Sequence, residues 1–296
     1  DRSASKVMEV VCNSVSQIFE RNQSYTDRIT GIGVGLPGRV DSTNGVSVYA
    51  LYFNDWHNVP VVDILASKFQ LPVYIEGGMQ LMALGETWYG AATDARNILC
   101  IGLRQGIGMG VVVDGQIYRG NHQTAGDIGH IVVEPNGTAC HCGRKGCLEA
   151  TASERAIYEW VKEYAKKNGV AAFHGLVSSV HELSMDKFYE AIREGNQLIL
   201  DRIRESGRII GRTLCDLVRI FDPDIIIVGG SFADASPVFL ESVIESYIRE
   251  KPNYAIEVPE ISASQLKENS VALGAAVLVL SQYFRAIDYN RATNPN

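Results

Sequence analysis

The hydrophobic positions of the chain repeat at helical spacing in some stretches and form short apolar runs in others, which indicates an α/β fold. Apolar residues recur at helical spacing over residues 5–20, and residues 28–36 then form a buried strand that ends in Pro37-Gly38. Further strands are predicted over residues 72–76, 97–103 and 225–228, and further helices over residues 61–69, 79–89, 151–164, 197–221 and 273–284.

Turn and capping residues set several boundaries of these elements. Asp114-Gly115 lies at the centre of residues 111–118 and predicts a β-hairpin. Thr151-Ala152-Ser153-Glu154 matches a capping box that opens a helix toward Tyr164. Ser236-Pro237 predicts the start of another helix, with serine as the cap and proline at the first helical position.

The composition is that of an ordinary globular protein of 296 residues, with 46% apolar and 21% charged residues. The net charge is −7, so these residues lack the basic face that binding to nucleic acid requires. No apolar leader or membrane span occurs in the sequence, and six cysteines are too few for a secreted disulfide scaffold. We therefore expect a cytoplasmic protein without a membrane partner.

The polar, small-residue stretch at residues 90–97 is the best candidate for a domain boundary.

A dense cysteine motif, Cys140-His141-Cys142-Gly143-Arg144-Lys145-Gly146-Cys147-Leu148-Glu149, follows His130 by ten positions. Three thiolates and one imidazole are the ligands that a closed tetrahedral zinc site needs, and the two glycines allow the tight turns between them. Four protein ligands leave no open position for water, so we expect the zinc to be structural. The other cysteines are scattered, as buried thiols usually are.

The glycine-rich segments could bind phosphate groups or simply form tight turns. Gly33-Val34-Gly35-Leu36-Pro37-Gly38 matches the dinucleotide fingerprint, but its glycines lie inside a strand and no helix follows. A nicotinamide or flavin enzyme is therefore disfavoured. Gly106-Ile107-Gly108-Met109-Gly110 and Gly229-Gly230 could approach a phosphate or an adenosine closely, and each signal is weak alone.

Gly126-Asp127-Ile128-Gly129-His130 and the cysteine motif together resemble the signature of the ROK family of repressors, open reading frames and sugar kinases. The resemblance extends over nearly the whole chain from about residue 7, through segments that share small and apolar residues at matching positions. These segments are residues 33–38 with Asp41 and Gly45, Trp56, Leu71-Pro72-Val73, Gly85-Glu86, residues 106–120, residues 225–230 and Leu273-Gly274-Ala275-Ala276.

The resemblance implies an actin-like, ribonuclease-H-like fold of two lobes with a sugar cleft between them. A small lobe would span residues 1–95, with the last helix, residues 279–296, packed back on it. A large lobe over residues 96–278 would hold the zinc motif and an oligomerisation surface for a homodimer or homotetramer. The implied zinc ligands are His130, Cys140, Cys142 and Cys147. The implied sugar contacts are Asp127 (usually glutamate in the family), the free ring nitrogen of His130, and Glu149.

The chain departs from the kinases of the family at the residue that accepts the proton. The kinases carry Glu-Asn-Asp-Ala where this chain reads Glu76-Gly77-Gly78-Met79, so Gly78 stands at the position of the aspartate. Loss of a positioned base removes a factor of about 10²–10⁴ in rate. In a continued strand, Glu76 would lie about 6.6 Å from position 78, too far to replace the aspartate.

The phosphate loops also depart from the kinase pattern. Arg104-Gln105-Gly106 replaces Gly-Thr-Gly, and the family's Asp-x-Gly-x-Thr loop does not occur in these residues. Four glycines are then expected to be vestiges of a nucleotide site, with no catalytic residue remaining. They are Gly106, Gly108, Gly229 and Gly230.

These departures favour the repressor branch of the family over its kinases. We expect the effector-sensing domain of a ROK transcriptional regulator that controls carbohydrate-related genes. A sugar or sugar derivative would bind near Gly77, Gly78, Asp127, His130 and Glu149, and operator DNA would bind to a winged helix upstream. The first alternative is a ROK kinase that phosphorylates a hexose or amino sugar with ATP. The second alternative is a zinc-stabilised interaction domain with no small ligand.

Overall fold

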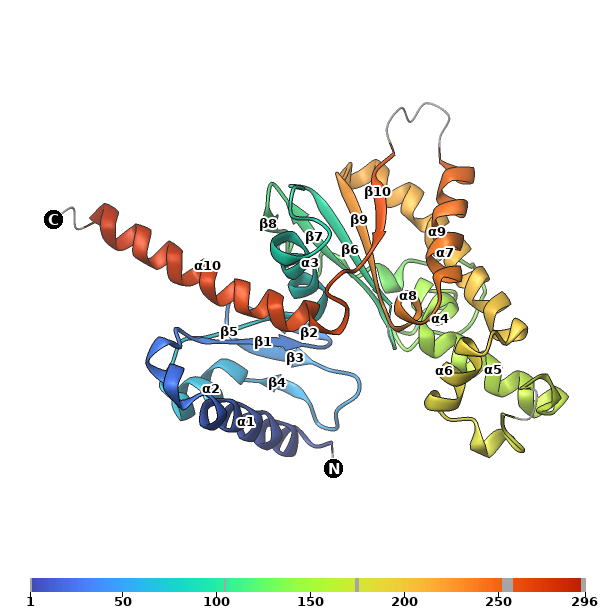
Figure 1. The fold of residues 1–296 in the computed structure, drawn as a ribbon, viewed down its shortest axis with the longest axis horizontal. Coiled ribbons are helices and arrows are strands. Elements are labelled where there is room, and N and C mark those ends of the chain that lie inside the picture. The colour runs from blue at the N-terminus through green and yellow to red at the C-terminus, as the bar shows by residue number, and fades with distance from the viewer. Residues whose placement is uncertain (1, 104, 174–175, 252–257, 294–296) are drawn as a thin grey trace.

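The computed structural model describes residues 2–103, 105–173, 176–251 and 258–293, which form two lobes joined where two helices cross (Figure 1). The strands are β1 (Ile32–Leu36), β2 (Arg39–Asp41), β3 (Val46–Tyr49), β4 (His57–Val59), β5 (Val73–Gly77), β6 (Ile98–Leu103), β7 (Ile107–Val113), β8 (Gln116–Ile117), β9 (Ile225–Gly230) and β10 (Glu260–Ala263). The helices are α1 (Ala4–Arg21), α2 (Val61–Phe69), α3 (Gly78–Tyr89), α4 (Leu148–Ala152), α5 (Glu154–Asn168), α6 (Met185–Arg193), α7 (Gln197–Phe221), α8 (Ser231–Ala235), α9 (Pro237–Glu250) and α10 (Ser270–Thr293).

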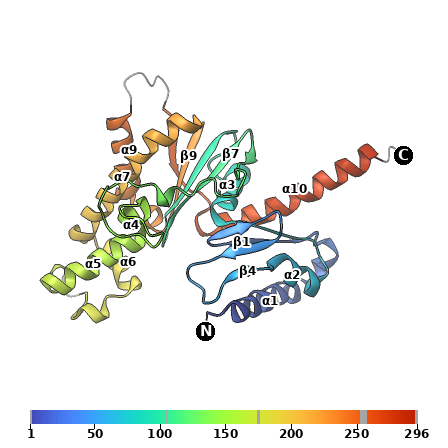
Figure 2. The same ribbon diagram turned by 180° about the vertical axis from the view of Figure 1, so that it is seen from behind.

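The first lobe contains two small sheets. Strands β1 and β5 are parallel, with Ile32 paired to Val73 and Leu36 paired to Gly77, and β2, β3 and β4 form an antiparallel sheet. Helices α1 and α2 bury their apolar faces against the β1–β5 sheet, on the side away from α10 (Figure 2). The opposite face lies so close to α10 that a Cβ at position 33 would come within 2.4 Å of the Ala275 carbonyl oxygen. This close packing explains glycine in β1, and no dinucleotide site is needed to explain it.

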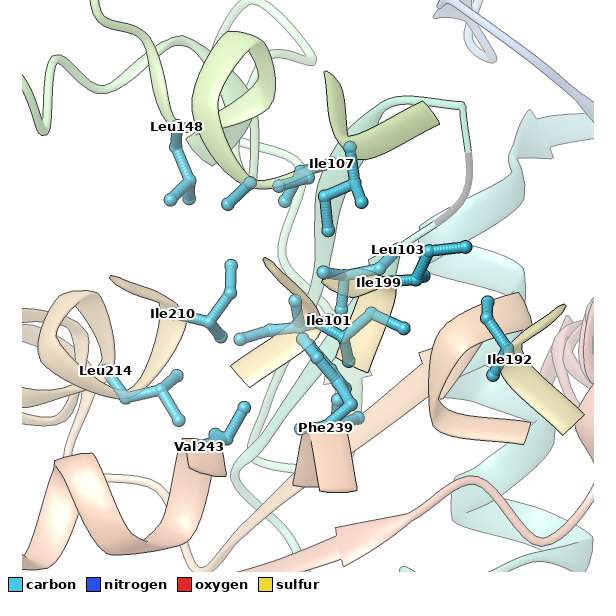
Figure 3. Close-up of a cluster of buried hydrophobic side chains, with 14 of the residues drawn as sticks. Ile101, Leu103, Ile107, Leu148, Ile192, Ile199, Ile210, Leu214, Phe239 and Val243 are labelled. Carbon is cyan, nitrogen blue, oxygen red and sulfur yellow. The ribbon is translucent and has the colours of Figure 1, made fainter. Parts of the chain in front are cut away.

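The second lobe is built on a five-stranded sheet in the order β10-β9-β6-β7-β8. Strands β6, β9 and β10 are parallel, while β7 and β8 are antiparallel to their neighbours. Every residue of β6 and β9 is buried, as expected for strands covered on both faces. Figure 3 shows Ile101 of β6 gathered with Ile210 of α7 and Phe239 and Val243 of α9 in the largest apolar cluster.

The lobes are connected where α3 and α10 cross. A Cβ at Gly274 would lie 1.8 Å from the carbonyl oxygen of Leu81, and a Cβ at Gly85 would lie 2.5 Å from that of Ser270, so each helix presents glycine to the other. The fully buried Glu86 fastens the crossing, because its carboxylate accepts hydrogen bonds from the Ser264 hydroxyl and from nearby backbone amides.

Several elements agree with the expectations from the sequence, and two do not. The helix over residues 197–221, the helix over 61–69 and the hairpin around Asp114-Gly115 are confirmed. The capping box is wrong by two residues: Thr151 lies inside α4, and Ser153 caps α5 by accepting from the Ala156 amide at 3.1 Å. The first strand begins at residue 32 instead of 28, because Gln23–Arg28 forms a 3₁₀ helix.

Within the described residues, no helix is both long enough and apolar enough to cross a membrane. Arg104 lies outside the described residues, as do positions 294–296 at the end of the segment 279–296. The first three turns of α10 lie against the first lobe, with Val271 beside Gly35, Ala275 beside Gly33 and Val279 beside Gly31.

The α3–α10 crossing yields a prediction about stability. Gly274→Ala should lower the free energy of unfolding by about 1–3 kcal/mol, because its Cβ meets a backbone oxygen that cannot move without shifting α3. Gly78→Ala is the matched control, since its Cβ would meet only the Leu36 oxygen at 3.9 Å, and it should leave stability unchanged or slightly higher. Urea unfolding of both variants measures the difference, and equal stabilities would contradict the close crossing.

Candidate functional site

The cysteine motif folds into a compact loop before α4. The Gly143 amide donates to the Cys140 carbonyl at 3.0 Å, and the Cys140 amide donates to the Arg144 carbonyl at 2.8 Å, which closes a tight turn. Val132 forms an isolated bridge with Cys147, so the end of the loop lies against the segment that follows His130. The backbone thereby brings side chains that are up to 17 positions apart in sequence to one point.

Four side chains meet at this point with the spacing of a tetrahedral metal site. The sulfur of Cys140 lies 3.5 Å from Nδ1 of His130, and the sulfurs of Cys142 and Cys147 lie 3.6 Å apart. Zinc at about 2.3 Å from sulfur and about 2.0 Å from nitrogen would place its ligands about 3.5–3.8 Å apart. All four ligand atoms lie within 4.8 Å of one another, so the cluster could hold a metal ion.

The electrostatics of the thiols also fit a cation. A hydrogen bond from the Arg144 backbone, together with the Arg144 side chain, lowers the pKa of Cys142 to about 6. Burial, with the neighbouring thiols, raises the pKa of Cys147 to about 12. A buried thiol beside another thiolate resists ionisation unless a positive charge stabilises it, and a metal ion supplies that charge. The residues present therefore fit zinc, with His130, Cys140, Cys142 and Cys147 as its ligands.

The residues expected to contact a sugar lie beside this cluster. His130 has its Nε2 atom 4.0 Å from the Asp127 carboxylate, and the Asp127 side chain is 63% exposed. Glu149, at the first turn of α4, forms a second close group with His130 and His141. If His130 binds a metal through Nδ1, its other ring nitrogen faces this polar group.

Glu149 connects two parts of the second lobe. One carboxylate oxygen accepts from the Ile107 amide at 3.1 Å, at the start of β7, and the other lies 2.8 Å from Nε2 of His141. A Cβ at Gly106 would come within 2.4 Å of the first oxygen, so the carboxylate rests directly on this glycine turn. The turn that could have received a phosphate therefore already faces a carboxylate.

Gly77 and Gly78 stand at the boundary between β5 and α3. Gly77 caps α3 in an extended conformation, and Gly78 is the first helical residue. Glu76 is buried, and its two oxygens accept from the Arg119 guanidinium at 2.6 Å and from the Gly77 amide at 3.0 Å. Because the strand ends at Gly77 and Glu76 is already paired, Glu76 is not placed to act as a base at position 78.

The segment of residues 121–125, which precedes Asp127, forms hydrogen bonds with the first lobe. The Gln123 amide oxygen accepts from the backbone and the hydroxyl of Ser42, both at 2.8 Å, and its nitrogen donates to Asp41 at 2.9 Å. The Gln80 side chain of α3 donates to the Ala125 carbonyl at 3.4 Å. The first turn of α3 therefore lies against the segment that precedes Asp127. An open cavity of about 480 Å³ lies between this segment and β2–β3, outside the Glu149 group.

The four expected vestiges of a nucleotide site lie at one end of the β9-β6-β7 sheet. Gly108 and Gly229 both pair with Gly102, and Gly230 pairs with Leu103. Packing is sufficient to explain most of these glycines. A Cβ at 108 would lie 3.0 Å from Met79, a Cβ at 229 would lie 2.1 Å from Met82, and Gly230 has a φ of +113°.

Three residues of this region were not identified from the sequence. His141 lies inside the cysteine motif, so its position between two metal ligands was an available signal. Tyr52 is far from the cysteine motif in the chain. Arg119 lies in the matching segment of residues 106–120, but its partner Glu76 is 43 positions away, so no signal in the sequence pointed to the pair. Burial and the nearby charge of Glu149 raise the pKa of Tyr52, which extends from the first lobe, while Arg155 beside it acts in the opposite direction.

Comparison with known proteins places the chain among both kinases and repressors. The family model described as "ROK family" matches residues 1–282. A glucokinase of Thermotoga maritima is 34% identical over 84% of this chain and 78% of that protein. A xylose repressor of Caldicellulosiruptor bescii is 30% identical over 96% of this chain and 71% of that protein. The crystal structure of a ROK family glucokinase from Streptomyces griseus, in complex with glucose and AMPPNP, has a TM-score of 0.83 and 30% identity, covering 94% of this chain and 88% of that one.

The metal cluster yields a prediction that elemental analysis can check. The purified protein should contain about one zinc ion per chain. Cys142→Ser should lose the zinc, and its free energy of unfolding should fall by several kcal/mol. Cys12→Ser is the control, because Cys12 lies in α1, away from the four ligands, and should retain zinc. A wild-type protein that is folded and free of metal after purification in zinc-containing buffer would contradict the assignment.

Proposed function

The chain belongs to the ROK family, and on that premise we propose that it is the effector-binding region of a ROK transcriptional regulator. A sugar or sugar derivative would bind beside the zinc centre, and the region would not transfer phosphate. The proposal includes the division into lobes at residues 95 and 96. The segment expected to join the small lobe from residue 279 instead does so from the start of α10 at Ser270, because Val271 and Ala275 already lie against Gly35 and Gly33.

The observation that carries this proposal is Gly78 at the first position of α3, where the kinases of the family hold aspartate. No side chain at this position can accept the hydroxyl proton of a sugar. Glu76, the nearest carboxylate in sequence, is buried and bound to Arg119. Phosphoryl transfer without a positioned base loses about 10²–10⁴ in rate.

The glycine turn before β7 supports the same conclusion. An anion-binding turn works by presenting free backbone amides to phosphate oxygens. Here the Ile107 amide already donates to Glu149, so an incoming phosphate would meet a carboxylate at the same place. Like charges at hydrogen-bonding distance repel each other strongly in a partly buried site.

The polar group beside the metal centre suits a polyol. Asp127 and Glu149 supply acceptors, and the ring nitrogen of His130 that faces away from the metal supplies a donor or an acceptor. Zinc at Nδ1 would fix the orientation of the ring and would thereby fix the direction of that hydrogen bond. Gly77 and Gly78 would border the same site, with the open space at Gly78 available to the effector.

The remaining parts of the proposal concern partners and location. Operator DNA would be bound by another segment of the whole protein, since the net charge of −7 does not suit DNA. We propose a homodimer or homotetramer, as is common in the family. Unpaired thiols that hold a metal require a reducing compartment, so we propose the cytoplasm.

A second candidate function is an ATP-dependent sugar kinase with relocated catalysis. The 34% identity to a glucokinase over most of both chains favours it. A zinc-stabilised interaction domain without a small ligand is the third candidate, and the same experiment separates all three.

We predict that the zinc-loaded protein binds a sugar without turning over ATP. A thermal-shift panel of glucose, xylose, N-acetylglucosamine and their phosphates should raise the melting temperature with at least one compound. A coupled assay with ATP and that compound should show ADP formation at the background rate. Turnover above background would establish the kinase, and the absence of any shift would favour the interaction domain.

The Gly77→Asn/Gly78→Asp variant tests whether the lost base explains the absence of turnover. A Cβ at position 78 is open, and the side-chain amide of Gln80 near a Cβ at position 77 can rotate away. Aspartate at the start of α3 is also favoured by the helix dipole, by about 0.3–1 kcal/mol. We expect a folded variant, with Gly78→Ala as the control that adds a side chain without a base.

A further inference from the structure

His141 is a residue of the cysteine motif that is not among the four metal ligands. It lies between Cys140 and Cys142, so its backbone position is fixed by whatever fixes those two thiols. Its ring packs edge-on against His130, with the ring centres 5.0 Å apart. Its Nε2 atom lies 2.8 Å from Glu149, and its side chain is 40% exposed.

The direction of this hydrogen bond follows from the chemistry of the two groups. An ionised carboxylate can only accept, so Nε2 of His141 carries the hydrogen and donates it to Oε1 of Glu149. The other Glu149 oxygen accepts from the Ile107 amide. Both oxygens of this carboxylate therefore accept a hydrogen bond. One bond comes from residues 140–147, the metal loop, and the other comes from the turn before β7, and each oxygen keeps a lone pair for a ligand.

The arrangement leaves Glu149 as the only described side chain that hydrogen-bonds both to the loop carrying Cys140 and Cys142 and to the amide of Ile107. The carboxylate of Glu149 ends a flexible side chain in the first turn of the short helix α4, so it could adopt several rotamers. The bond from His141 selects one of them. It also ties the metal loop to the sheet at a point away from the metal.

We propose that His141 is a positioning residue that couples the metal centre to the effector site through Glu149. It acts on Glu149 and does not ligate the metal itself. This inference rests on the proposed function for the effector half of the coupling. The metal half depends only on the contacts within the second lobe, and it can be tested without any sugar.

The test is a double-mutant cycle on the rate of zinc release. Zinc-loaded wild type, His141→Ala, Glu149→Ala and the double variant are mixed with excess chromophoric chelator, and zinc transfer is followed by absorbance. Each single variant should release zinc about three- to tenfold faster, because the loop loses a charge-assisted hydrogen bond. The double variant should be no faster than Glu149→Ala, since both substitutions remove the same contact.

The variant His141→Gln tests whether His141 acts by positioning Glu149 or only supports the structure of the loop. Its side-chain amide can donate to Glu149 in place of Nε2, so it should restore the wild-type release rate, whereas alanine should not. His181→Ala, an imidazole deletion outside the metal group, should match wild type throughout. Additive effects in the double variant, a wild-type rate for His141→Ala, or failure of glutamine to rescue would each overturn the coupling.

Sugar affinity provides the second readout of the same variants. With any compound that shifts the wild-type melting temperature, His141→Ala should bind about tenfold more weakly at full zinc occupancy, and His141→Gln should bind normally. Equal affinity of His141→Ala and wild type would overturn the effector half of the coupling. If no compound in the panel shifts the wild type, the proposed function fails, and the zinc-release cycle still decides the role of His141.

Discussion

The contact between α3 and α10 is the constraint on which the arrangement of the two lobes depends. The helices approach until the backbone of one touches the backbone of the other at Gly85 and Gly274, and a side chain at either position would force them apart. Buried Glu86 holds the junction by accepting hydrogen bonds from the segment that enters α10. Because α3 begins at Gly78 and α10 lies against β1, this crossing sets where the first lobe meets the residues around Asp127. Hydrogen bonds of Gln123 with Asp41 and Ser42 join the two lobes at a second point.

The candidate site is organised around the carboxylate of Glu149. Glu149 receives a hydrogen bond from the turn before β7 and another from His141, so it connects sheet and metal loop in addition to any ligand it binds. The same bond occupies the amide that a phosphate would need. At the boundary between β5 and α3, Glu76 is paired with Arg119 and Gly78 supplies no side chain. In the proposed function, separate residues would therefore account for sugar recognition and for the loss of phosphoryl transfer.

The sequence allowed much of this to be predicted where the signal is local. Helix α7 follows from its apolar periodicity. The spacing of the cysteines and glycines predicted a metal cluster, and the family resemblance added His130 to the three cysteines that the structure brings together. The capping error arose because Thr151 and Ser153 are both good caps, and only the break between α4 and α5 decides between them. Strands β2–β4 were missed because they are short and half exposed. The Glu76–Arg119 pair could not have been foreseen, because 43 positions separate its members and only the packed lobes bring them together.

We propose that this chain keeps a sugar site and has lost its nucleotide site. Calorimetric titration of the zinc-loaded protein tests it most directly, using a sugar that raises the melting temperature and a non-hydrolysable ATP analogue. The sugar should bind with the same affinity whether or not the analogue is present, and the analogue alone should produce no binding heat. Saturable binding of the analogue that strengthens sugar binding would instead show two intact and coupled substrate sites, which are the property of a kinase.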